Sequence, residues 1–373
     1  MVWQNEFPQD ETLVYLNHAA VGPWPKRAQL AVSAFAEENI YHGAANYPNW
    51  LKVEQSLRQR LQRLINAPSY DDIALQKNTS EALSVIAYGL PWQPGDNIVI
   101  SSHEFPSNRI VWESLANQGV TVKIAELDNS ATPEQTIIDC IDTHTRLVSI
   151  SSVQYATGLK IDCSKLGRAC KEHNVLFCID AIQSVGALRF DAQAYQADFV
   201  VADGHKWMLG PEGLALFYST PAARHQLQLN EYGWHMVKHR GKYDRLEWEV
   251  AENAQRFECG SPNMLGIYAL NASLSLLEEI GMCEVERQLT LRVDYLIDGL
   301  KALNDVSIIS PTEKHHRAGI VTFRHKYISA PKLYQSLMDN NIICAHRGGG
   351  VRFSPHFYTP FEKLDRALNF LTQ

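Results

Sequence analysis

The chain has 373 residues, 34 of them basic and 41 acidic, so its formal net charge at pH 7 is −7. This charge provides no broad positive surface for nucleic acid or anionic lipid, and we expect neither as a partner. The 7 cysteines include no CxxC pair, the first residues do not resemble a signal peptide, and no apolar run approaches the ~18 residues of a membrane span. These features predict a cytoplasmic protein with reduced thiols.

Apolar residues recur at helical spacing from 51 to 66, which predicts an amphipathic helix. Short apolar runs then alternate with helical patterns. The runs predict strands at Asn97–Ser101, Val120–Ile124, Leu147–Ser151, Val175–Ile179, Phe199–Ala202 and Leu214–Tyr218. The patterns between them predict helices near 80–90, 108–118, 133–142 and 163–173. This alternation indicates α/β architecture with a mostly parallel sheet covered by helices.

The alternation stops near residue 220, and a helical pattern resumes over 266–304. The remaining chain predicts a strand at Gly319–Phe323, a helix near 331–339, a glycine-rich loop at 348–350 and a last helix after Pro360. We therefore expect two domains. Residues 15–255 would form the large domain, and residues 1–14 and 256–373 a small α+β domain.

Polar residues follow the predicted strands, and ligands bind at the carboxyl ends of parallel strands. Thr79 and Ser80 belong to a segment that precedes a predicted helix, where hydroxyls and free backbone N–H groups suit a phosphate dianion, although the segment also fits an ordinary helix cap. Asp180 closes an apolar strand, where its carboxylate would face a cation or cap the next segment. Gln183 could reach the same ligand or face solvent.

Lys206 follows the strand that ends at Ala202, which delivers an amine to the same edge of the sheet. A lysine that forms a Schiff base with an aldehyde needs a lowered pKa, supplied by burial and a neighbouring positive charge. The alternative is a solvated loop lysine.

The segment 180–213, read as DAIQ…ADGHKWMLGPEG, resembles the cofactor-lysine region of the class-V aminotransferase family of pyridoxal 5′-phosphate (PLP) enzymes. The resemblance continues in order from Tyr15–Ala20 to Val351–His356. It implies the PLP-dependent transferase fold type I: a large domain with a mostly parallel seven-stranded sheet, and a small α+β C-terminal domain. It also implies PLP as the cofactor and a homodimer with shared active sites.

The resemblance assigns Lys206 the catalytic role, as the internal aldimine with PLP. Asp180 would pair with the pyridinium, Gln183 would approach the phenolic oxygen, and Phe105 would stack on the ring. The implied phosphate contacts are Thr79, Ser80, His205 and, from the neighbouring subunit, Ser261. The implied substrate contacts are Arg352, Asn17 and His18, with the Arg352 guanidinium holding the α-carboxylate.

Departures from the cysteine desulfurases of this family affect the expected reaction. Cys344 stands ahead of Arg347 with no long loop after it, and its apolar neighbours suggest a buried, inert thiol, so we expect low desulfurase activity. Phe105 replaces a histidine and Tyr155 an asparagine. Asp203 replaces a hydroxyl residue near the phosphate, so its carboxylate should turn away or be bridged by a cation or donor.

The expected function is therefore that of a PLP-dependent enzyme acting on an amino acid through an external aldimine and a Cα carbanion. An aminotransferase or C–S lyase is favoured, and a cysteine desulfurase or amino-acid epimerase remains an alternative. A non-catalytic PLP-binding protein is a further alternative. A nucleotide site is disfavoured because GxxxxGK[ST] and strand-linked GxGxxG are absent, and without HExxH or paired CxxC we expect no metal site.

Overall fold

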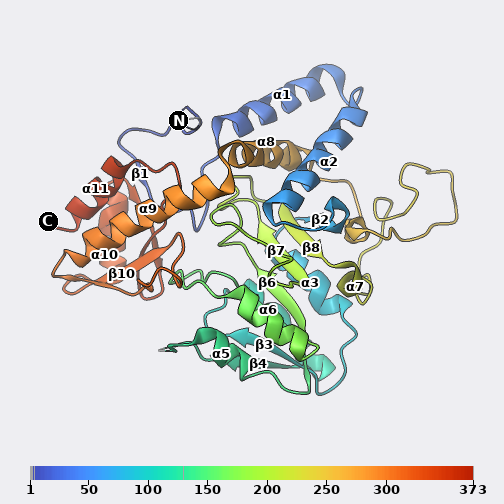
Figure 1. Cartoon of the computed structure of the whole chain (residues 1–373). Helices are drawn as coiled ribbons and strands as arrows, with labels where there is room; N and C mark the ends of the chain where they lie inside the picture. Colours follow the sequence, from blue (N-terminus) through green and yellow to red (C-terminus); the bar gives the residue numbers. More distant parts are fainter. Residues whose placement is uncertain (1–2, 4, 129, 373) are drawn as a thin grey trace.

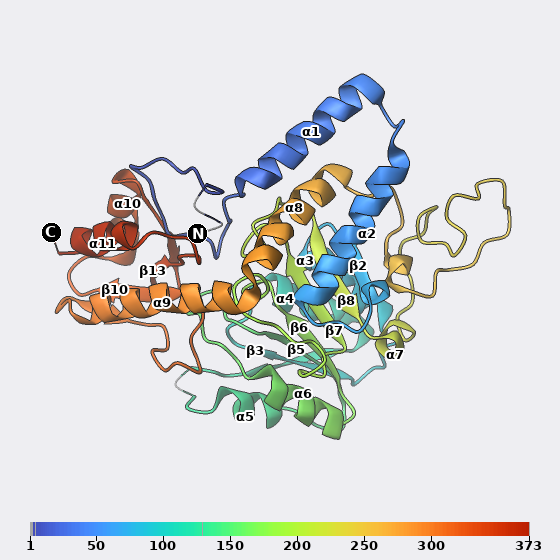
Figure 2. The same cartoon turned by 45° about the horizontal axis from the view of Figure 1, so that its top comes forward.

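The computed structural model describes residue 3, residues 5–128 and residues 130–372. A large α/β domain and a small domain lie side by side (Figure 1). A loop between α7 (Pro221–Arg224) and a 3₁₀ turn at Ala254–Phe257 projects from the large domain, on the side away from the small domain in Figure 1 and Figure 2. Within the described residues, no helix has both the length and the apolar character needed to cross a membrane.

The large domain is built on a seven-stranded sheet of order β2-β8-β7-β6-β5-β3-β4, in which only β8 runs antiparallel to its neighbours. Its strands are β2 (Ile73–Gln76), β3 (Asn97–Ser101), β4 (Thr121–Ala125), β5 (Thr145–Ser151), β6 (Leu176–Asp180), β7 (Phe199–Asp203) and β8 (Ala215–Ser219). This confirms the mostly parallel seven-stranded sheet. Six strands lie within two residues of their predicted bounds, whereas no apolar run had indicated β2.

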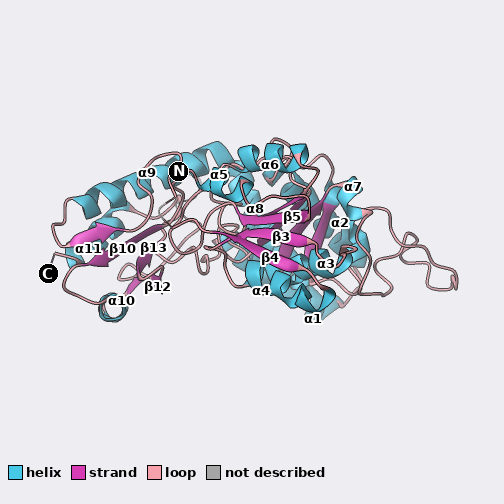
Figure 3. Ribbon diagram, turned by 90° about the horizontal axis from the view of Figure 1, so that it is seen from below, coloured by secondary structure: helices cyan, strands magenta, loops and turns pink. Residues whose placement is uncertain are grey.

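Helices cover both faces of this sheet (Figure 3). One face packs against α2 (Tyr47–Leu64), α5 (Pro133–Ile138), α6 (Cys163–Glu172) and α8 (Met264–Ile280). The other packs against α3 (Thr79–Gly89), α4 (Ser107–Glu113) and the 3₁₀ helix at Ser114–Gln118. In β6, Phe177 and Ile179 face the first group while Cys178 faces the second. Burial on both faces explains the continuous apolar run of β6, whereas the edge strand β4 is partly exposed and contains polar residues.

The small domain has an antiparallel sheet of order β12-β13-β10-β9. Its strands are β9 (Val306–Ile308), β10 (Val321–His325), β12 (Ala345–Arg347) and β13 (Gly350–Phe353), and its helices are α9 (Met282–Lys301), α10 (Ala330–Asp339) and α11 (Phe361–Phe370). The N-terminal strand β1 (Val14–Tyr15) pairs in parallel with β11 (Ile342–Ile343). The predicted small α+β domain is thus confirmed.

The helical pattern over 266–304 forms two helices separated at Gly281, whose φ is +83°. The apolar side chains of α8 join the large-domain core with α1 (Lys26–His42) and α2, whereas those of α9 beyond Val285 join the small-domain core. The predicted division at residues 255 and 256 stays a prediction, and this packing attaches α8 to the large domain.

Candidate active site

Five chain segments leave the sheet at one edge, because β2, β3, β5, β6 and β7 run in the same direction. Each of these strands ends at, or is followed within four residues by, one polar or aromatic residue of the site. In chain order these residues are Thr79, Phe105, Tyr155, Asp180 and Lys206. The topology therefore gathers the predicted cofactor residues of the large domain at the edge where parallel sheets bind ligands.

Lys206 is a buried amine, with 9% of its surface exposed. Burial lowers its pKa, and the positive charge of Arg352 lowers it further, against the opposing effect of Asp180. The Nζ atom lies 5.7 Å from the centre of the Phe105 ring. A lowered pKa increases the neutral fraction of the amine, which is the form that attacks an aldehyde.

The loop that carries Lys206 packs closely against the N-terminal segment. A Cβ added at Gly22 would lie 2.1 Å from the Lys206 carbonyl oxygen, so only glycine fits there. The Gly22 N–H donates to the His205 carbonyl at 2.7 Å. These contacts hold the lysine in one position.

Asp180 ends β6 and is 2% exposed. Burial raises its pKa, and the nearby carboxylates of Glu104 and Asp203 raise it further, while Lys206 lowers it. Its Oδ1 accepts a hydrogen bond of 3.0 Å from the Ile182 N–H. A buried carboxylate in this position favours a cation opposite it, and the predicted pyridinium nitrogen meets this need.

Gln183 is buried, and its side-chain amide joins two other segments. Nε2 donates to the Ala19 carbonyl at 3.0 Å, and Oε1 accepts from the Trp207 indole at 2.8 Å. The second hydrogen on Nε2 of Gln183 is not used in these contacts, and it is the donor available for the predicted contact with the phenolic oxygen of PLP.

The first turn of α3 contains both predicted phosphate-binding hydroxyls. Asn78 is the helix cap, because its Oδ1 accepts from the Glu81 N–H at 2.9 Å. Thr79 is therefore not needed as the cap, and its buried Oγ1 has no hydrogen-bond partner among the described residues. Ser80 is exposed and donates to Ser107 Oγ at 2.8 Å. An unpartnered buried hydroxyl at a helix N-terminus fits a phosphate oxygen.

Asp203 lies beside His205, with Oδ1 and Nδ1 separated by 2.8 Å. The pair is within ion-pair distance but not aligned as a hydrogen bond, and neither atom has another partner among the described residues. The expectation that the Asp203 carboxylate turns away or is bridged by a cation or donor stays a prediction. Ser261 is exposed, and its predicted contact needs a second chain, so the phosphate roles of His205 and Ser261 stay predictions.

Arg352 extends from β13 of the small domain and is 3% exposed. Its Nη1 donates to the Tyr155 carbonyl at 2.6 Å, while Nε is buried without a partner among the described residues. Burial, and then the charge of Arg347, lower its pKa to about 10. Asn17 pairs with Ser354 through a parallel bridge, and its Oδ1 is also buried without a described partner. Both side chains thus have a buried polar atom without a partner among the described residues, and their substrate contacts stay predictions.

His18 differs from these residues because both of its ring nitrogens are used within the protein. Nδ1 lies 2.9 Å from the Ser354 carbonyl and therefore carries the proton, and Nε2 accepts from the Tyr358 hydroxyl at 2.7 Å. Burial lowers the pKa of His18 to about 4. No ring nitrogen is left for the predicted substrate contact, so we omit His18 from the proposed substrate-binding group.

Glu104 is a buried carboxylate that the sequence interpretation overlooked. It accepts hydrogen bonds from Ser101 at 2.7 Å and Asn108 at 2.8 Å, and from the Ser151 N–H at 3.1 Å. These contacts join β3, α4 and β5 directly beside Phe105. The sequence does contain an indication of this residue, because Glu104 closely follows the predicted strand Asn97–Ser101. Ligands bind at the carboxyl ends of parallel strands, and the same reasoning that selected Asp180 also selects Glu104.

Cys344 is 2% exposed, between β11 and β12. Burial raises its pKa to about 12, which keeps the thiol protonated at neutral pH. Such a thiol is a poor nucleophile.

The rings of Phe105 and Tyr155 pack edge-to-face, with centres 5.1 Å apart. The two residues that replace the histidine and the asparagine of the desulfurases are therefore in contact.

A second group of buried ionisable side chains lies apart from this edge. Glu54, His235 and Glu258 are close enough to share a metal ion. However, Arg58 donates to Glu54 at 2.6 Å and to Glu258 at 2.6 and 2.7 Å. The guanidinium supplies the positive charge that a metal would provide, so this cluster does not argue for a metal ion.

The residues at the sheet edge fit PLP: a buried amine for the aldehyde, a buried carboxylate for the ring nitrogen, and an unpartnered hydroxyl at a helix N-terminus for the phosphate. Fold and site together define a PLP-dependent enzyme of fold type I. The chain belongs to the class-V aminotransferase family, whose family model matches residues 14–366.

Curated relatives include two proteins named probable cysteine desulfurase. The one from Methanothermobacter thermautotrophicus is 28% identical, with 94% of this chain and 92% of that protein covered. The one from Pyrococcus abyssi is 27% identical, with 99% and 96% covered.

Two solved structures share the fold. One is a complex of the cystine C–S lyase C-DES with its reaction product cysteine persulfide, with a TM-score of 0.90, 22% identity, and 97% of this chain and 98% of that chain covered. The other is the apo cysteine desulfurase from Thermococcus onnurineus NA1, with a TM-score of 0.88, 24% identity, and 99% and 96% covered.

Proposed function

We propose that this PLP enzyme is a C–S lyase. Its substrate would be a cysteine-type amino acid, in which it cleaves the bond between Cβ and sulfur and releases the sulfur in a small product. The observation that carries the proposal is the burial of Cys344, since a desulfurase passes the sulfur to a reactive protein thiol and this thiol is enclosed and protonated. The name of the curated relatives, cysteine desulfurase, supports a sulfur-bearing substrate.

When bound, PLP supplies a conjugated ring that withdraws electrons from the substrate Cα. Asp180 would hold the proton on the ring nitrogen through its buried carboxylate, and Thr79 would hold the phosphate. Arg352 would orient the substrate by its α-carboxylate, because a planar guanidinium donates two parallel hydrogen bonds.

Lys206 would take the proton from Cα once the substrate amine has replaced it. Its lowered pKa favours the neutral form, which can accept that proton. Phe105 provides a face for the ring but no acid or base, so proton movement depends on Lys206. Loss of the sulfur substituent from Cβ then gives, after hydrolysis, one keto acid and one ammonia for each C–S bond broken.

The reaction type is tested by product analysis. The holoenzyme is incubated with cysteine, cystine, cysteine sulfinate or alanine, each with and without a keto-acid acceptor. We expect pyruvate and ammonia in equal amounts from cysteine or cystine, with sulfide or persulfide, and no dependence on the acceptor. Turnover that requires the acceptor would show an aminotransferase instead, racemised alanine would show an epimerase, and an absence of any turnover would favour a PLP-binding protein.

The role of Cys344 is tested separately with Cys344→Ala. We expect the variant to release sulfur at nearly the wild-type rate. Formation of alanine from cysteine by the wild type, together with loss of that activity in the variant, would identify a desulfurase and contradict the proposal.

We also propose a homodimer, in which Ser261 of each subunit contacts the phosphate bound by the other. The exposed position of Ser261 supports this, as does its location in a segment that follows the projecting loop. Light scattering should give twice the mass of the chain, which is 42.1 kDa. A monomer that retains full PLP affinity would contradict the shared site.

A further inference from the structure

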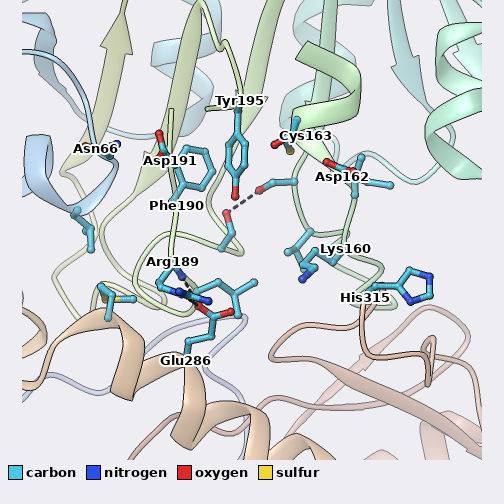
Figure 4. Close-up of a pocket in the computed structure, with 18 of the residues that line it drawn as sticks. Asn66, Lys160, Asp162, Cys163, Arg189, Phe190, Asp191, Tyr195, Glu286 and His315 are labelled. Atoms are coloured by element: carbon cyan, nitrogen blue, oxygen red, sulfur yellow. Dashed lines mark hydrogen bonds and ion pairs between the residues drawn. The ribbon is translucent and has the colours of Figure 1, made fainter. Parts of the chain in front are cut away.

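A separate cavity of about 890 Å³ lies between the two domains, and Lys206 does not line it. The large domain contributes the start of α6 and the segment 184–195, and the small domain contributes the start of α9 and the loop around His315 (Figure 4). This volume is in the range of small-molecule sites. The cavity is therefore large enough for a metabolite that would touch both domains at once.

Three donor side chains surround the cavity in Figure 4. Tyr195 enters from the top with its hydroxyl directed inward, Lys160 lies to the right, and Arg189 lies below. Burial, first among several causes, raises the pKa of Tyr195 to about 12, so its hydroxyl remains a hydrogen-bond donor at neutral pH. Phe190 packs on Tyr195 with ring centres 5.0 Å apart and provides an apolar wall.

The acidic residues of the cavity are already engaged in protein contacts. Glu286 accepts from Arg189 Nε at 2.8 Å, Glu134 accepts from the Asp162 N–H at 2.8 Å, and Asp162 caps α6 through the Lys165 N–H at 3.1 Å. Asp191 accepts from the Ala194 N–H at 2.9 Å. Each of these carboxylates thus accepts a hydrogen bond from the protein, and among the described residues Glu286 is the one within ion-pair distance of a cation.

The cationic side chains that line the cavity include Lys160 and Arg189. Within the described part of the chain, no acidic group lies within ion-pair distance of Lys160, and Arg189, whose side chain is 66% exposed, pairs with Glu286 through Nε. A ligand with a negative group would satisfy these donors and the Tyr195 hydroxyl. The wall at Phe190 and Leu188 favours an apolar portion in the same ligand.

We infer that this cavity binds a small organic carboxylate, with its negative group near Lys160 and Arg189 and its apolar portion against Phe190. The ligand would belong to a site distinct from the one that holds PLP. The inference concerns a second binding site, and it does not depend on which reaction the enzyme catalyses.

Two serine residues that line the cavity connect it to the active site. Ser152 and Ser184 line it, with their hydroxyls 2.7 Å apart. The Ser152 N–H and hydroxyl both donate to the Asp180 carbonyl, at 3.0 and 3.2 Å. Asp180 is thereby attached to the cavity wall through its own backbone.

A second connection runs through the segment between Ser152 and Lys160. It contains Tyr155, whose carbonyl holds Arg352. Lys160 itself donates its N–H to the His316 carbonyl at 2.8 Å and so reaches the small domain. A carboxylate bound at Lys160 therefore acts on the segment that positions Arg352, and we expect it to alter substrate affinity as well as to bind.

The charge preference is tested by calorimetric titration of the PLP-loaded enzyme with benzoate and with benzamidine. These probes have the same ring and opposite charges. We expect saturable binding of benzoate and none of benzamidine. Tighter binding of benzamidine would indicate a cation site, and no heat with benzoate at millimolar concentrations would show that the cavity is not a carboxylate site; either result overturns the inference.

The location is tested with variants. Lys160→Met should weaken benzoate binding by about 10-fold or more, the loss expected for one charge-assisted hydrogen bond. Tyr195→Phe should weaken it several-fold while keeping the packing with Phe190. Lys171→Met removes the same charge from an exposed position on α6 outside the cavity and should change nothing.

Benzoate could also occupy the substrate site at Arg352, so Arg352→Gln is titrated in parallel. We expect this variant to retain benzoate binding. If binding is lost in Arg352→Gln and unchanged in Lys160→Met, benzoate occupies the substrate site alone and the inference is wrong.

Discussion

Two groups of buried charges in this protein differ in what their polar atoms bind. At Arg58, burial acts to lower the pKa, but the carboxylates of Glu258 and Glu54 outweigh it and raise the pKa overall. At Lys206, burial lowers the pKa and Asp180 compensates only partly. In the first group the carboxylates more than compensate for the burial of the cation, whereas in the second group the burial of the amine is compensated only in part.

The hydrogen bonds show the same contrast. Arg58 makes contacts of 2.6 to 2.7 Å to both carboxylates and one of 2.8 Å to the Ile73 carbonyl. At the active site, Thr79 Oγ1, Arg352 Nε and Asn17 Oδ1 are buried without partners among the described residues. Unpartnered buried polar atoms are costly, so several of them at one sheet edge indicate a ligand. In the Arg58 cluster only Glu54 Oε2 lacks a partner among the described residues, which indicates a structural role.

The largest effect should come from removing the amine at position 206. We expect Lys206→Ala to lower the turnover rate by at least about 10³-fold, because the proton-transfer group is lost. The thermal stability of the PLP-free protein should not fall, since a buried amine with a lowered pKa does not stabilise the fold. Turnover assays and thermal unfolding measure the two effects.

Lys206→Arg is the matched control for charge. It keeps a cation at this position but cannot condense with an aldehyde, so it should be as inactive as Lys206→Ala. Borohydride treatment followed by mass spectrometry should attach PLP to the wild type at Lys206 and to neither variant. Wild-type turnover in either variant would refute the catalytic role.

Breaking the paired cluster should affect stability. Arg58→Met leaves two buried carboxylates without their cation, and we expect the free energy of unfolding to fall by about 3–5 kcal/mol. Arg109→Met is the control, because it removes an exposed arginine paired with Glu113 and should cost less than about 1 kcal/mol. Urea unfolding monitored by fluorescence measures both, and equal losses would show that the Arg58 cluster is not structural.

Arg352 tests whether a buried guanidinium with an unpartnered Nε binds the substrate carboxylate. Arg352→Lys retains the charge but not the planar pair of donors, so we expect KM to rise about 10- to 100-fold with a smaller change in kcat. Arg324→Lys, an exposed site on the neighbouring strand β10, should leave both constants unchanged. An unaltered KM in Arg352→Lys would count against the substrate role.

The smallest expected effect concerns His18, which was predicted to bind substrate but is paired like Arg58. Its folded pKa of about 4 lies below the ordinary 6.5, so the unfolded chain binds the additional proton between these values. Stability should therefore fall as pH decreases through this window, by about 2 kcal/mol between pH 7 and pH 5 for this group. His356, whose pKa is also lowered by burial, adds to the same trend.

Urea unfolding at pH 7 and pH 5 measures this effect in the wild type and in His18→Gln. The variant cannot be protonated at this position, so the difference between the two pH values should shrink by about 2 kcal/mol. If the difference is unchanged, His18 is not the titrating group, and a rise in KM without loss of stability would restore it to the substrate site.

Much of the fold and part of the site could be predicted from residue patterns. Five of the six predicted strands, all except the partly exposed edge strand β4, are largely buried, and burial on both faces selects apolar residues along their length. β2 was missed because Ile73–Gln76 is only 4 residues long and ends in a buried glutamine. Asp180 could be predicted because a polar residue directly after such a run stands out, and Lys206 because it follows another run by four residues within a segment that resembles the family.

Only the tertiary structure decided which polar atoms have partners. Thr79 and His18 are both buried polar residues in motifs that resemble the family, yet Thr79 Oγ1 has no described partner and His18 has one at each nitrogen. Those partners, Ser354 and Tyr358, lie more than 300 residues away along the chain. Local patterns determined the strands and the positions at their ends, because burial and backbone geometry act on neighbouring residues. The free hydrogen-bonding capacity depends on contacts between distant segments, which no local pattern contains.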